Sequence, residues 1–167
     1  TDGTFALSST VTVESVPWAI VPGDFNRDGK PDLAVANKNA STISILQNNG
    51  DGTFTAKPSF SALILPWALV AGDFNRDGKL DLAGAMQATD NVRFFPGNGD
   101  GTFGTSTAFL TGTGSGPRNI VAGDLNRDGK LDLVAAGFGS HTLTVLIGDG
   151  VGGFAATNIG IGPTILA

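Results

Sequence analysis

Three short loops hold most of the acidic side chains of this sequence. Each has the nine-residue pattern Asp-x-Asn-x-Asp-Gly-x-x-Asp, and the three copies begin at Asp24, Asp73 and Asp124. The pattern places side-chain oxygens at its first, third, fifth and ninth positions. A glycine at the sixth position permits a sharp turn that leaves the carbonyl of the seventh residue pointing inward. Such a loop offers five oxygen donors, which is the donor set of a hard cation.

Each loop would therefore supply four side chains and one main-chain carbonyl to a metal ion. The expected ligands in the first loop are Asp24, Asn26, Asp28, the carbonyl of Lys30, and Asp32. In the second loop they are Asp73, Asn75, Asp77, the carbonyl of Lys79, and Asp81. In the third they are Asp124, Asn126, Asp128, the carbonyl of Lys130, and Asp132. Oxygen ligands with three carboxylates suit Ca²⁺ better than Zn²⁺, which takes nitrogen or sulfur, or Mg²⁺, which keeps more water. We therefore expect three calcium sites.

The same loop pattern has two other interpretations. An EF-hand would need a glutamate at the twelfth position, where this chain has Val35, Gly84 and Ala135, so that motif is excluded. The second interpretation is a network of Asx turns, in which the side chains bind the backbone and no metal is present. Three carboxylates that converge without a cation would repel one another, which favours calcium.

The loops belong to a longer repeat, because they recur after 49 and 51 residues. A second block, Asp-Gly-Thr-Phe, recurs at 2–5, 51–54 and 100–103, with a degraded copy at 151–154. The first full period contains four runs of strand length, at 18–21, 33–36, 42–46 and 54–60. Their short connections predict antiparallel pairing, and glycines in the 49–52 turn supply the positive φ that a hairpin needs.

Four strands in about 50 residues predict one blade of a β-propeller, since a lone sheet cannot bury its two apolar faces. The expected fold is all-β, with four-stranded antiparallel blades at 17–65, 66–116 and 117–162. Residues 1–16 would be the last strand of a preceding blade, and 163–167 the start of a further one. Propellers close with about four to eight blades. We therefore expect either a fragment of a longer propeller or a homo-oligomer that completes the ring. An open stack of three blades, the other arrangement considered, would expose sheet edges.

The segments GDFNRDGKPDLAVAN, GDFNRDGKLDLAGAM and GDLNRDGKLDLVAAG, each followed by a turn similar to NGDGTF, resemble the FG-GAP/VCBS repeats of integrin-like β-propellers. The resemblance covers essentially the whole chain. It implies that each loop joins the first and second strands of a blade and binds calcium through the residues named above. It also implies a secreted or cell-surface protein that serves adhesion, sugar binding or as a non-catalytic module beside an enzyme.

One position of the repeat is a candidate ligand site. It is filled by Trp18, Trp67 and Arg118, each directly after a proline and ahead of an apolar strand. Tryptophan faces stack on sugar rings, and arginine binds carboxylates or hydroxyls, so this position predicts carbohydrate sites between blades. The alternative is that these side chains only pack between blades. The function expected is thus a calcium-binding module for extracellular recognition, of carbohydrate or alternatively of a protein partner.

Other function classes are disfavoured by composition. The net charge is −5 and the ten basic residues form no stripe, so nucleic acid is not an expected partner. The most apolar stretch, 62–72, is far shorter than the roughly 20 residues of a membrane span. Cysteine is absent, His141 is the only histidine, and no hydrolase or nucleotide-binding motif occurs, so we expect no enzyme activity. Asn39 begins a sequon that would be glycosylated only in a eukaryotic secretory cell.

Overall fold

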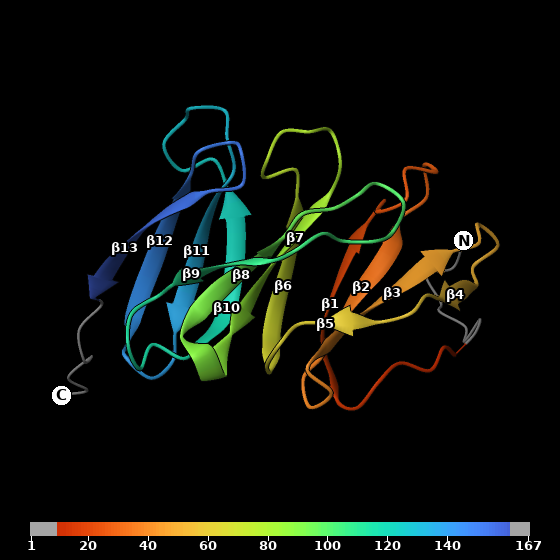
Figure 1. Ribbon diagram of the computed structural model, residues 1–167, viewed down its shortest axis with the longest axis horizontal. Helices are drawn as coiled ribbons and strands as arrows, with labels where there is room; N and C mark the ends of the chain where they lie inside the picture. The colour runs from red at the N-terminus through yellow and green to blue at the C-terminus, as the bar shows by residue number, and fades with distance from the viewer. Residues whose placement is uncertain (1–9, 161–167) are drawn as a thin grey trace, which may run out of the picture.

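Short apolar runs between Gly, Asn and Asp turns fold here into antiparallel strands. The computed structural model describes residues 10–160, and within them thirteen strands form three sheets that stand side by side (Figure 1). In each sheet the first four strands pair in sequence order, and the additional strand of the first sheet, β5, pairs with β3. The chain is therefore all-β and built from β-propeller blades, as the repeat predicted.

The strand order repeats from blade to blade. Blade 1 contains β1 (Pro17–Gly23), β2 (Asp32–Asn37), β3 (Thr42–Asn48), β4 (Phe54–Ala56) and β5 (Phe60–Ser61). Blade 2 contains β6 (Pro66–Gly72), β7 (Asp81–Met86), β8 (Asn91–Phe95) and β9 (Thr107–Leu110), with a short 3₁₀ turn, η1 (Gln87–Thr89), between β7 and β8. Blade 3 contains β10 (Pro117–Gly123), β11 (Asp132–Gly137), β12 (Thr142–Gly148) and β13 (Phe154–Gly160).

The outermost strand is interrupted or shortened in blades 1 and 2, whereas β13 of blade 3 pairs with β12 without a break. The prediction of one continuous strand over 54–60 was wrong, because β4 and β5 pair separately with β3. The interruption contains Pro58, which has no N–H to donate to the ladder. In blade 2, Phe103 makes only an isolated bridge with Gly97 before β9 begins.

The connections divide between the two ends of the blades. The Asp loops join β1 to β2, β6 to β7 and β10 to β11, and they lie together at the top of Figure 1. The β3–β4 turn is at the same end, with Gly50 and Gly52 at φ +85° and +87° as expected of this hairpin. The turns that join β2 to β3, β7 to β8 and β11 to β12 lie at the opposite end, at the bottom of Figure 1.

Face-to-face packing of the blades forms the core. One buried cluster lies between blades 1 and 2, and another between blades 2 and 3. The second residue of an Asp loop anchors each interface: Phe25 is 2% exposed and meets Phe103 at 5.8 Å, while Phe74 is 1% exposed and meets Phe154 at 6.0 Å between ring centroids. The first strands, β1, β6 and β10, are neighbours along the inner edge of the stack.

The outer faces of the first and last blades are uncovered within residues 10–160. Leu125, the counterpart of Phe25 and Phe74, is 53% exposed, and Val121 beside it is 57% exposed. On blade 1, Ile20 is 61% exposed. The expected flanking segments, 163–167 and most of 1–16, lie outside the described residues. No helix in the described part of the chain is long and apolar enough to cross a membrane.

The packing predicts unequal effects of truncating equivalent loop residues. Phe74→Ala should lower the free energy of unfolding by about 3–5 kcal/mol, because it empties a filled site between two blades. In the single chain, at concentrations too low for association, Leu125→Ala should change it by no more than about 0.5 kcal/mol, because that side chain is half exposed. Urea unfolding of the wild type and both variants measures these differences in the free energy of unfolding. Equal losses would show that Leu125 is also buried in solution.

Candidate calcium loops and an aromatic–cationic row

The Asp loops have closely similar internal hydrogen bonds. In the first, the two carboxylate oxygens of Asp24 accept the amides of Asp28 at 3.1 Å and Gly29 at 2.9 Å. Asn26 Oδ1 also accepts the Asp28 amide, and Asp28 Oδ1 accepts the Lys30 amide. The second and third loops repeat these bonds. The side chains at positions 1, 3 and 5 therefore shape the loop by Asx turns.

The aspartate at the ninth position is buried in every loop. Asp32, Asp81 and Asp132 are each 0% exposed. One oxygen of each accepts a backbone amide at the end of the third strand of its blade, and the donors are Asn48, Gly97 and Gly148 at 2.9, 2.8 and 2.9 Å. These carboxylates fasten the Asp loop to the adjoining hairpin.

Burial shifts the pKa of two of these carboxyl groups, Asp32 and Asp81. It raises the pKa of Asp32, with a smaller opposing effect from the Asn48 amide and a further increase from the nearby charge of Asp28. Burial likewise raises the pKa of Asp81. By contrast, the amide of Lys130, followed by its ammonium group, lowers the pKa of the exposed Asp128. A cation in the first loop would offset both the burial and the repulsion that act on Asp32.

Among the described residues, no three acidic, histidine or cysteine side chains are grouped as a ready metal site. The carboxylates turn toward loop amides, and a lysine approaches the fifth position of each loop at 3.8, 3.3 and 3.1 Å. The donor chemistry nevertheless fits a hard cation, since all five expected donors are oxygens. In addition, Asp32 Oδ2 is buried and has no hydrogen-bond partner. Whether the loops bind calcium stays a prediction.

The candidate ligand position is a β-bulge. In blade 1, Pro17 pairs with Asn37 and Ala19 with Ala36, so Trp18 is the extra residue of the strand. The same register shift occurs at Trp67 and Arg118. A bulge turns the extra side chain out of the regular alternation of the strand, which explains why these side chains leave the sheet face.

The three bulge residues belong to one continuous group, which we call the aromatic–cationic row: Trp18, Lys38, Trp67, Arg118 and Phe138. The two indoles meet edge to face, with 5.0 Å between centroids. Lys38 Nζ lies 4.6 Å from the Trp18 ring and 3.7 Å from the Trp67 ring. Arg118 Cζ lies 4.4 Å from the Trp67 ring and 3.6 Å from the Phe138 ring. The row crosses all three blades.

Exposure varies along the row. Its ends are open, since Trp18 is 54% and Phe138 61% exposed. Its centre is half-buried, and both Trp67 Nε1 and Arg118 Nε are buried without a hydrogen-bond partner among the described residues. Two cations already contact the Trp67 ring. Packing between blades therefore describes Trp67, whereas Arg118 is only partly buried and Trp18 keeps an accessible surface.

Sequence reasoning missed Lys38 and Phe138. Both follow the second strand of a blade, and with Gln87 they occupy one position of the repeat, at spacings of 49 and 51 residues. Alignment on that period could have grouped them, but their three residue types share no chemistry. Strand pairing brings both residues beside a bulge. Asn37 pairs with Pro17, so Lys38, which follows β2, lies beside the start of β1. Gly137 pairs with Pro117, so Phe138, which follows β11, lies beside the start of β10.

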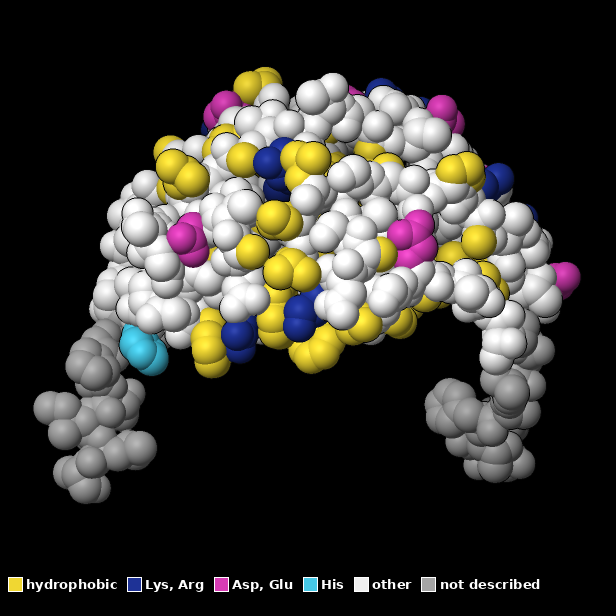
Figure 2. Space-filling model, turned by 60° about the horizontal axis from the view of Figure 1, so that its bottom comes forward, with side chains coloured by type: hydrophobic (Ala, Val, Ile, Leu, Met, Phe, Trp, Pro, Cys, Tyr) yellow, Lys and Arg dark blue, Asp and Glu magenta, His cyan; other side chains and the backbone are white. Residues whose placement is uncertain are grey.

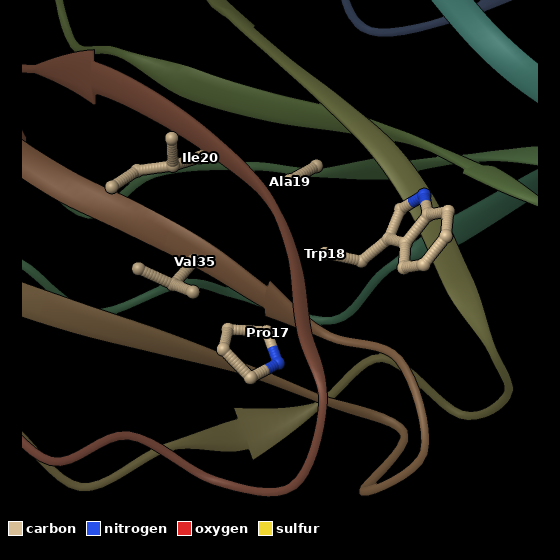
Figure 3. A pocket seen from close by; sticks show the side chains of 5 residues that line it. All are labelled: Pro17, Trp18, Ala19, Ile20 and Val35. Atoms are coloured by element: carbon tan, nitrogen blue, oxygen red, sulfur yellow. The ribbon is translucent and has the colours of Figure 1, made fainter.

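A hollow of about 210 Å³ adjoins the row at blade 1. Figure 3 shows Pro17, Ile20 and Val35 on one side of β1 and the Trp18 indole on the other. The hollow is lined by apolar side chains and one sheet face. It therefore belongs to the uncovered face of blade 1 more than to the row.

A family model described as the FG-GAP-like repeat matches residues 24–84 and, in a second copy, residues 81–135. The chain belongs to this family. That assignment confirms the resemblance found in the Asp loops. Both matches of the FG-GAP model contain complete Asp loops. No curated protein matches the sequence.

Two solved structures share the FG-GAP chain's fold. One is an Agrocybe aegerita lectin that recognises non-reducing terminal N-acetylglucosamine. Its sequence is 24% identical and its TM-score is 0.54, and the alignment covers 83% of this chain and 37% of the lectin. The other is a Lactobacillus plantarum protein with 17% identity and a TM-score of 0.64, with 90% of this chain and 44% of that protein covered. The chain thus spans less than half the length of either structure.

Proposed function

We propose that this FG-GAP chain is a calcium-binding module that recognises carbohydrate outside the cell. The observation that carries the proposal is Trp18, a half-exposed indole at the open end of a row that is otherwise fixed by packing. An accessible indole held in place by a second ring is a suitable platform for the apolar face of a sugar. The lectin of similar fold supports this ligand class.

Calcium has a structural role in this proposal. The Asp loops lie at one end of the blades, and the starts of β1, β6 and β10, which contain the bulge residues, lie at the other (Figure 1). An ion held by Asp24, Asn26, Asp28, the Lys30 carbonyl and Asp32 would neutralise the carboxylates of the first loop, at the opposite end of the blade from the row. It would stabilise the loop that carries Phe25 into the blade interface.

A second candidate is a module for protein adhesion or a structural unit of a larger secreted protein. The half-buried centre of the row favours it, because Trp67 and Arg118 contact each other across adjacent blades. We propose a binding role and no catalysis in either case. His141, the only histidine, is exposed in the β11–β12 turn at φ +54°.

Calcium should raise the melting temperature relative to chelated protein. At tenfold saturation each site adds about 1.4 kcal/mol, so three sites would add about 4 kcal/mol. The variant Asp28→Asn/Asp77→Asn/Asp128→Asn keeps an oxygen to accept the loop amide but loses three charges. In EGTA the melting temperature of this variant should be close to that of the wild type. Calcium should raise it much less than it raises the melting temperature of the wild type. Equal wild-type melting curves with and without EGTA would contradict the calcium sites.

Carbohydrate binding should depend on Trp18. A glycan array probed in millimolar calcium, with a chelator control, identifies the ligands. Trp18→Ala should abolish the signal while the melting temperature stays within a few degrees, because the indole is half exposed. Trp67→Ala is the comparison and should lower stability as well. A blank array with folded wild-type protein would overturn the carbohydrate proposal in favour of adhesion.

We also propose that blades of a second copy cover the open faces. Val121 and Leu125 on blade 3 repeat the positions of Val70 and Phe74, which pack against the next blade inside this chain. The purified chain should therefore show a mass above 16.9 kDa by light scattering. Val121→Asp should lower the measured mass to that of one chain. Val151→Asp, which changes a turn residue that is 78% exposed, should leave the measured mass unchanged. A wild-type monomer at all concentrations would contradict this.

A further inference from the structure

We infer that the ligand of the aromatic–cationic row is an acidic saccharide, whose carboxylate or sulfate group is bound by Lys38 and Arg118. The inference rests on the proposed carbohydrate function and specifies its ligand class. Its starting point is that the row contains two cationic groups and no acidic one.

Neither cation has a carboxylate partner among residues 10–160. The salt bridges within this range all lie in the Asp loops and involve Lys30, Lys79 and Lys130. Lys38 and Arg118 instead contact aromatic rings, in a protein whose net charge is −5. An aromatic face attracts a cation but carries no net charge, so the two positive charges remain uncompensated.

The two cations are close enough to act on one ligand. Both contact the Trp67 ring, which limits the distance from Lys38 Nζ to Arg118 Cζ to about 8 Å, a range over which like charges still repel. An anionic group near them would relieve this repulsion. Lysine offers three N–H donors and arginine five, and both bind carboxylate and sulfate oxygens.

The acidic groups near this end of the blades already have partners. The carboxylate of Asp90, in the β7–β8 turn, accepts the amides of Gly114 at 2.7 Å and Gly116 at 2.8 Å. Glu14 accepts the hydroxyl of Thr42 at 2.8 Å and that of Ser59. Neither carboxylate lies within salt-bridge distance of Lys38 or Arg118.

The surface around the row has the mixed character that a charged sugar requires. Figure 2 shows Lys and Arg side chains beside hydrophobic ones at the middle of the concave border of the molecule. Trp18 supplies an apolar surface for the sugar ring, and Lys38 contacts the same indole at 4.6 Å. A saccharide that packs on Trp18 would thus hold its acidic substituent beside Lys38. This combination favours an acidic sugar over a neutral one.

Calorimetric titration of the full chain, in calcium, with hyaluronate, dextran sulfate and neutral dextran tests the inference. The first two polymers distinguish carboxylate from sulfate, and the third measures binding without charge. We expect at least one acidic polymer to bind about tenfold more tightly than dextran, with an affinity that falls as salt is raised.

Substitutions of Lys38 and Arg118 test whether these two cations bind the acidic polymer. Lys38→Gln and Arg118→Gln should each weaken the acidic polymer about tenfold, Lys38→Arg should retain binding, and Lys57→Gln, a cation on the outer part of blade 1, should have no effect. Thermal melts confirm that each variant is folded. Equal binding of dextran and acidic polymers would overturn the inference while leaving the carbohydrate function intact. Equal losses in the Lys57→Gln control would also overturn it, and absence of binding to any glycan would overturn both proposals.

Discussion

The structure depends on the burial of both faces of each thin sheet. A four-stranded blade of this composition is apolar on its two sides and cannot be stable alone, so each blade needs a neighbour. Small residues in the second strand, such as Ala34 and Ala36 at 0% exposure, let two blades approach closely. Large residues at the rim, above all Phe25 and Phe74, then fill the space at the loop end.

This packing ties the Asp loops to the core. In the first two loops the residue that follows the first aspartate is inserted between blades, and in all three the last aspartate is buried in the sheet. The amide of Gly101, in the outer turn of blade 2, donates to the carbonyl of Phe25 at 2.9 Å, so a loop of one blade also binds the next blade. Any ion that orders such a loop would therefore stabilise the contact between blades as well as the loop.

The two ends of the blades have opposite chemistry. At one end, repeated aspartates gather negative charge that backbone amides and lysines only partly offset. At the other, bulges direct Trp18, Trp67 and Arg118 into a row whose two cations have no carboxylate partner among residues 10–160. Because the sheet core separates the ends, the proposed cation at one end would not exclude the proposed anionic ligand at the other. The exposed faces of blades 1 and 3 are a third surface, equivalent by position to the interfaces within the chain.

The sequence alone determined the blade and its repeat, because these depend on local signals. Alternation of apolar residues, turn glycines and a fixed period of about 50 residues specify strands and hairpins without knowledge of distant contacts. The donor types of the Asp loops could be read for the same reason. The break of the outer strand at Pro58 was missed, although its cause is also local.

Only the tertiary structure decided which of the candidate side chains meet. Trp18 and Lys38 are 20 residues apart, and Trp67 joins them from another blade, so their contact depends on a bulge, on strand register and on blade stacking together. Leu125 differs from Phe74 in exposure because of what covers it, which no local pattern records. Residue types and spacing are local properties, whereas contact and burial depend on packing between segments that are distant in the chain.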